Sequence, residues 1–368
     1  MRKANLRPLY LVLLTTFIGC QTTKNLDIQV TSNTQEIKKD IPLSALVEWQ
    51  QFFIEQETAL TPKPASLAKS LQRPDEEEAY NALIIEEYDK AEKIFKAILQ
   101  KNDSSYQRIL LQLATLYLRK GDVSRCLQNL QELKTHLAKT DHNKDLIFPY
   151  RYILAISYLK EGDLNQGREI LADLIRIDPK FSPAYSALAL SYLNLEKFQA
   201  SEYIVTKGID NSGENPTLLT LLALTKEALG DDTQAMQILE RVTRKSPQYV
   251  EGLMALVSLK LKKGESFDLK QKIQKIFSLS SHNAKAYVLL GLIYLREKKI
   301  EAAQNSFQQA ILKDPQNVYG RLNLAILYLD HLQKPREAQR LLSELLQIRE
   351  TPMNIRDFAS SYLADFKS

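Results

Sequence analysis

The chain has 368 residues, of which 44% are hydrophobic and 25% charged, and this excludes a wholly disordered chain and a polytopic membrane protein. Only 11 Gly and 13 Pro, with many Leu, Ala, Lys, Glu and Gln, favour an all-helical protein, and two Cys are too few for a disulfide scaffold. The net charge of +5 falls to +2 without the three basic residues of the first segment, so no charge excess predicts a nucleic-acid partner.

Residues 1–19 have the pattern of a secretory signal peptide. Arg2, Lys3 and Arg7 precede an apolar stretch, residues 9–18, that is too short to span a bilayer as a mature helix. The segment ends in Gly19-Cys20 and resembles the bacterial lipobox. That resemblance implies cleavage before Cys20 and attachment of a diacylglycerol to its thiol. The alternative is an ordinary signal peptide, or a short uncleaved anchor, in which Cys20 is incidental.

Gln21 follows Cys20, where an Asp would signal retention in the inner membrane. By the same resemblance, the protein is expected at the outer membrane, facing the periplasm. Residues 20–41 are polar and unpatterned and are predicted to form a flexible tether.

Residues 42–71 are predicted to form an N-terminal helix and a Pro-containing linker. Apolar residues follow helical spacing from Leu43 to Ile54, and this stretch contains Trp49, the only Trp of the chain. The helix either caps the first repeat or docks a partner, and the sequence leaves both open.

An internal repeat dominates the rest of the chain. Residues 284–317 resemble the tetratricopeptide repeat (TPR) at each of its signature positions: Tyr287, Leu290, Gly291, Tyr294, Ala303, Phe307, Ala310 and Pro315. The same frame recurs every 34 residues through residues 148–317, and less regular units precede and follow it. The resemblance implies an all-α, right-handed superhelical solenoid of about eight helix-turn-helix repeats over residues 72–352, closed by a C-terminal cap helix over residues 353–368.

The residue types of the repeat suit close helix packing. Small residues recur where two helices of a repeat cross, and Cys126 occupies one such position, so it is interpreted as a buried packing residue. Gly121, Gly162, Gly230 and Gly264 fall at the turn within a repeat, where Gly can adopt the left-handed conformation that ends a helix.

Motifs for chemistry are missing from the sequence. Gly208 and Gly213 have phosphate-loop spacing, but Glu214 stands where that loop requires Lys. The histidines have no spacing typical of zinc ligands. We therefore expect no catalytic residue, cofactor, metal or small-molecule substrate, and no enzyme activity. The acidic run at residues 75–78 is interpreted as a solvated helix face.

The resemblance implies a concave groove whose wall comes from positions 5, 9 and 12 of each first helix. Those positions are mostly apolar here, which predicts a wall that binds an apolar protein segment. The candidate contacts are Leu111, Tyr152, Ile156, Leu190, Leu224, Met254, Leu292 and Ile326. The alternative is that part of these side chains packs between helices.

The function expected from these patterns is that of a non-enzymatic scaffold lipoprotein. It would bind envelope proteins and aid assembly of an envelope machine for pili, secretion, motility or outer-membrane biogenesis. The alternative is a factor for cell-wall or polysaccharide synthesis or export that binds a glycan or its synthase. An aliphatic groove favours a protein segment over a glycan.

Overall fold

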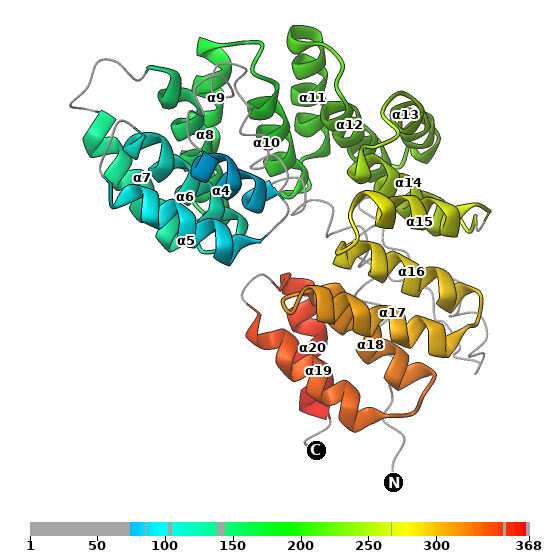
Figure 1. The fold of residues 1–368 in the computed structure, drawn as a ribbon. Coiled ribbons are helices and arrows are strands. Elements are labelled where there is room, and N and C mark those ends of the chain that lie inside the picture. Colours follow the sequence, from blue (N-terminus) through cyan, green and yellow to red (C-terminus); the bar gives the residue numbers. More distant parts are fainter. Residues whose placement is uncertain are drawn as a thin grey trace. The chain divides into compact units, whose positions relative to one another are not determined.

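The computed structural model describes residues 74–84, 87–101, 105–137, 144–265, 267–348 and 351–365. In these ranges all regular elements are α-helices, seventeen in number, with no strand (Figure 1). The predictions made for residues 1–19, 20–41 and 42–71 lie outside the described residues. Among the helices that are described, none combines the length and apolar character needed to cross a membrane.

The described chain divides into two compact units between Ala255 and Leu256. The first unit contains the helices α4 (Pro74–Ile84), α5 (Tyr88–Leu99), α6 (Tyr106–Arg119), α7 (Val123–Leu137), α8 (Lys144–Glu161), α9 (Leu164–Ile177), α10 (Ser182–Leu193), α11 (Phe198–Ser212), α12 (Pro216–Ala228) and α13 (Asp232–Lys245). The division falls inside α14 (Val250–Lys262). The second unit continues with α15 (Leu269–Leu279), α16 (Ala284–Arg296), α17 (Ile300–Lys313), α18 (Val318–Asp330), α19 (Pro335–Gln347) and α20 (Met353–Asp365).

The helices from α4 to α19 alternate between the first and second helix of a repeat. In each unit a first helix packs on its own second helix, as α10 does on α11 and α16 on α17, and the second helix then packs on the next repeat. First helices of consecutive repeats also contact each other, as α6 does α8 and α10 does α12. The all-α class, the stacked helix pairs and the terminal helix α20, which packs on α19, are as predicted.

The small residues predicted at helix crossings are buried. Gly291 shows how close the approach is, because a Cβ atom built there would lie 2.4 Å from Cε1 of Phe307. Cys126 has no exposed surface, and its Sγ lies 3.2 Å from the Ser157 hydroxyl. Burial raises the pKa of the Cys126 thiol to about 11, so the neutral thiol acts as a packing group.

In the repeats from α6 onward, the turn between the two helices places one residue in the left-handed region. Gly121, Gly162, Gly230 and Gly264 have φ between 76° and 93°, as their positions predict. In the repeats that lack this Gly, Glu196 and Lys298 adopt φ of 58° and 60° at the same position. The turn conformation is therefore set by the packing of the two helices, even where the side chain disfavours it.

The interpretation of residues 75–78 as a solvated face is wrong for Glu76. Its side chain is only 2% exposed, and Arg108 of α6 donates from Nη2 to both carboxylate oxygens at 2.9 and 2.8 Å. Asp75 pairs with Lys101 at 2.8 Å. The sequence missed these pairs because their partners lie 26 and 32 residues away and meet only when α4 packs on the following helices.

A polar network joins the first two described repeats around Glu92 of α5. Lys96 donates to its carboxylate at 2.7 Å, the Tyr117 hydroxyl at 2.9 Å and Lys120 at 3.2 Å. The Lys96 hydrogen bond is the largest of the effects that hold the pKa of Glu92 at about 2, against an ordinary value of 4.5.

Replacing Glu92 with Gln is expected to lower stability by about 1–2 kcal/mol at neutral pH. A depressed carboxyl pKa adds stability that is present above the unfolded pKa and is lost as pH falls through the folded pKa. The difference between wild type and Glu92→Gln should therefore shrink between about pH 4.5 and pH 2. Urea unfolding at several pH values measures it, and a difference that stays constant over this range would contradict the network's role.

Candidate functional site

The eight candidate groove residues lie on the first helices of their repeats, as predicted, but most of them are not exposed. Seven of them, from Leu111 to Leu292, have exposed fractions between 0 and 7%. Ile326 alone is half-buried. The expectation of an open apolar wall at these positions is therefore corrected. Whether any of them contacts a partner stays a prediction.

The physical reason lies in the spacing of neighbouring repeats. Because α6 packs against α8, and α10 against α12, the side chains between first helices are enclosed by protein. Polar residues at the same register, such as Thr115 and Thr220, are also fully buried. The alternative considered from the sequence, that these side chains pack between helices, is the one that fits their burial.

A basic residue at position 13 of several first helices, such as Arg119, binds the preceding first helix, and the sequence reasoning missed this contact. Arg119 donates from Nη1 to the Leu83 carbonyl oxygen at 3.0 Å, and Lys160 donates to that of Leu118 at 3.5 Å. Arg296 donates to the carbonyl of Leu261 in the second unit. In each case a cation reaches a carbonyl near the C-terminal end of the preceding first helix, where the helix dipole favours positive charge. A basic residue recurring at one repeat position was the signal that could have revealed it.

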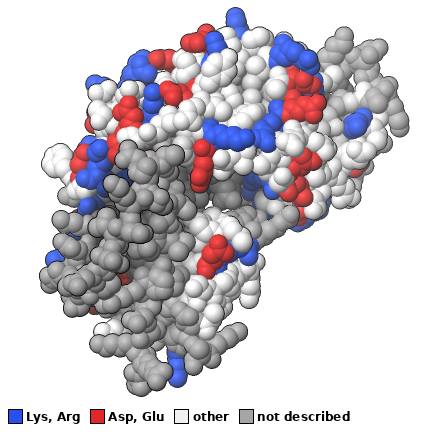
Figure 2. Space-filling view, turned by 180° about the vertical axis from the view of Figure 1, so that it is seen from behind, with Lys and Arg blue, Asp and Glu red and all other residues white. Residues whose placement is uncertain are grey.

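Acidic and basic side chains are intermingled on the face shown in Figure 2, over the residues described there. Ion pairs in the described part of the chain include Lys226 with Glu202 at 2.7 Å and Arg241 with Glu214 at 3.1 Å. A search of the described residues finds no group of His, Cys, Asp and Glu that could hold a metal ion. Cys20, the predicted lipidation site, lies outside the described residues.

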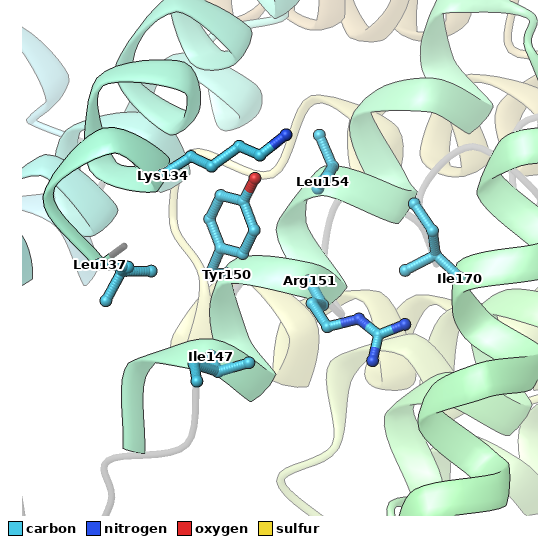
Figure 3. Close-up of a pocket in the computed structure, with 7 residues that line it drawn as sticks. All are labelled: Lys134, Leu137, Ile147, Tyr150, Arg151, Leu154 and Ile170. Carbon is cyan, nitrogen blue, oxygen red and sulfur yellow. The ribbon is translucent and has the colours of Figure 1, made fainter. Parts of the chain in front are cut away.

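A pocket of about 410 Å³ opens where α7, α8 and α9 meet (Figure 3). Its aliphatic lining comes from all three helices, and Lys134, Tyr150 and Arg151 add an ammonium, a phenol and a guanidinium. The full lining is Lys134, Leu137, Ile147, Tyr150, Arg151, Leu154 and Ile170. Its residues come from the second helix of one repeat and from both helices of the next.

The charged groups of the pocket differ in how they are engaged. Arg151 donates from Nη2 to Oδ2 of Asp173 at 3.0 Å. Lys134 and the Tyr150 hydroxyl form no hydrogen bond or ion pair within the described part of the chain. Burial raises the pKa of the Tyr150 phenol, so the group is a neutral hydrogen-bond donor at physiological pH. All the polar groups that line the pocket can donate, and no carboxylate lines it.

Comparison with known proteins identifies the repeats. Models of the tetratricopeptide repeat match residues 284–317, 150–180 and 218–249. The TPR repeat-containing protein YpiA of Bacillus subtilis is 25% identical over 227 residues, which are 59% of this chain. The chain spans about half (52%) of the length of that relative.

Solved structures support the same fold. A tetratricopeptide repeat protein from Parabacteroides merdae matches with a TM-score of 0.51 at 19% identity, over 69% of this chain and 97% of that one. The Cut9–Hcn1 structure of the APC/C matches with a TM-score of 0.54 at 17% identity, over 78% of this chain and 54% of that one. The chain thus contains tetratricopeptide repeats at residues 150–180, 218–249 and 284–317, and its fold resembles that of tetratricopeptide-repeat proteins, which generally act as protein-interaction scaffolds.

Proposed function

We propose that this tetratricopeptide-repeat protein is a non-enzymatic scaffold that is anchored by a lipid in the bacterial envelope and binds envelope proteins. The observation that carries the proposal is the succession of helices from α4 to α19, in which first and second helices pack pairwise within each of the two units. Each added repeat lengthens the exposed surface of a stacked protein. It does not enlarge an enclosed cavity of the kind that holds an active site. Assembly of an envelope machine is the process that fits a tethered surface of this kind.

The envelope location rests on the sequence of the first segment. A basic start, a short apolar stretch and Gly19-Cys20 support lipid attachment, and Gln21 supports the outer membrane with the solenoid facing the periplasm. Several acyl chains on Cys20 would suffice for stable anchoring, unlike a single chain.

The proposed anchor predicts that a Cys20→Ser variant remains an unprocessed precursor without lipid. The hydroxyl cannot form the thioether that carries the diacylglycerol, and processing depends on that modification. Labelling with palmitate and fractionation of membranes measure the outcome. The wild type should be labelled and membrane-bound, and a Ser variant that is still cleaved and labelled with palmitate would show that Cys20 is not the lipid site.

Cross-linking and affinity capture from solubilised envelopes test the scaffold itself. The wild-type chain should retain defined envelope proteins, and heat-unfolded chain serves as the control for nonspecific retention. Recovery of labelled cell-wall glycan in place of protein would instead favour the cell-wall or polysaccharide alternative. Turnover of an envelope component by the purified chain would contradict the non-enzymatic assignment.

A further inference from the structure

The pocket between α7, α8 and α9 combines an aliphatic interior with two donors, Lys134 and Tyr150, that form no hydrogen bond within the described residues. Figure 3 shows the Tyr150 ring standing between Leu137 and Ile147 on one side and Leu154 and Ile170 on the other, with its hydroxyl directed toward the side where the Lys134 ammonium lies. An aliphatic group bound against these apolar side chains would be removed from water, which favours binding. An anion next to the Tyr150 hydroxyl and the Lys134 ammonium would accept hydrogen bonds from both groups.

The charges of the lining residues favour a negatively charged ligand. Lys134 is exposed and forms no ion pair in the described part of the chain, and Arg151 keeps its charge close by while it bonds Asp173. The lining residues therefore have an excess of positive charge and include no carboxylate, so a cationic group would be repelled, whereas an anion would gain both charge attraction and hydrogen bonds.

The exposure of the walls favours a peptide over an acyl chain. Ile147 is 42% exposed, and the other lining residues are half-buried or exposed, so the pocket shelters one or two side chains and leaves its remaining surface open. A long acyl chain needs enclosure from water along its length. Short aliphatic side chains next to a carboxylate match a volume of about 410 Å³, near the lower end of ordinary ligand pockets.

We propose that this pocket docks an acidic–aliphatic peptide segment of a protein partner, with its Asp or Glu carboxylate held by Lys134 and Tyr150 and its Leu, Ile or Val seated against Leu154 and Ile170. The inference rests on the proposed scaffold function and gives that function one specific contact. The docking point lies away from the buried side chains between the first helices, so a partner can engage it without opening the repeat stack.

Binding of a defined probe tests the pocket in the full-length chain. The probe is a fluorescein-labelled heptapeptide of sequence Ser-Leu-Glu-Glu-Leu-Leu-Ser, followed by fluorescence anisotropy. Versions with Lys in place of Glu, and with Ser in place of Leu, test the acidic and aliphatic parts separately. Lys134→Glu should weaken binding of the acidic probe at least tenfold because it replaces attraction with repulsion. Tyr150→Phe should weaken it about three- to fivefold because it removes one hydrogen bond.

Lys180→Glu is the matched control, because Lys180 is exposed in the same unit, does not line the pocket and undergoes the same change of charge. Equal loss of affinity in Lys134→Glu and Lys180→Glu would overturn the pocket, since it would reflect net charge alone. Displacement of the probe by decanoate at a lower concentration than by unlabelled peptide would overturn the peptide assignment and identify an acyl carboxylate as the ligand.

Failure of the pocket proposal can be distinguished from failure of the scaffold proposal. If envelope proteins are captured equally by wild type and Lys134→Glu and the probe binds neither, the pocket inference is wrong while the scaffold stands. If the probe binds as expected and no envelope protein is captured, the pocket stands and the scaffold proposal is wrong.

Discussion

A Leu190→Glu, Leu224→Glu double variant is expected to lose the helical fold of the unit that ends at Ala255. Leu190 is 1% exposed and Leu224 is 7% exposed, on α10 and α12, which contact each other directly. A carboxylate at either position would be buried without a partner. Each such charge costs about 3 kcal/mol or more, and two together approach the whole stability of a typical domain, about 5–15 kcal/mol.

Circular dichroism at 222 nm with thermal melting measures this result. Tyr203→Glu is the control, because it also exchanges a large apolar side chain for Glu, but at a position on α11 that is 65% exposed. The control should melt close to wild type. The opposite result would be a double variant that keeps its helicity and melting temperature but no longer captures partners. It would show that these two leucines face solvent and would support the groove predicted from the sequence.

Gly291→Leu is the second change with a large expected effect, and it acts in the unit that starts at Leu256. A Cβ at this position already lies 2.4, 2.6 and 2.8 Å from three ring atoms of Phe307. The ring has no exposed surface, so it cannot move out into solvent to make room. Overpacking commonly costs about 1–3 kcal/mol, and a whole leucine side chain at this crossing should cost at least the upper value.

The steric cause can be separated from a loss of helix propensity, because Ala favours a helix interior over Gly by about 1 kcal/mol. Gly291→Ala should therefore destabilise the protein despite its better propensity, and adding Phe307→Leu should recover part of the loss by making space for the new methyl group. Chemical denaturation of the three variants measures the effect. An unchanged or higher melting temperature for Gly291→Ala would show that α16 and α17 are not packed this tightly.

The sequence by itself determined the repeat register, because each of its signals is local or periodic. Gly162 and Gly230 end a helix through backbone freedom that belongs to the residue itself. Ala303 and Gly291 recur at fixed positions because two helices of one repeat can cross closely only where side chains are small. These requirements hold within 34 residues, so they are visible as a pattern along the chain.

Only the tertiary structure decided which helix faces are buried. The periodicity of the sequence shows which side of a helix is apolar, but it does not show which other helix packs against that side. Leu190 is buried, so it does not face an open groove, and Glu76 is buried beside Arg108 of the next repeat, so it does not lie on a solvated face. The donors Lys134 and Tyr150 come from α7 and α8 and meet at one pocket. Burial and pocket formation depend on distances between segments far apart in sequence, and those distances are fixed only when the repeats stack.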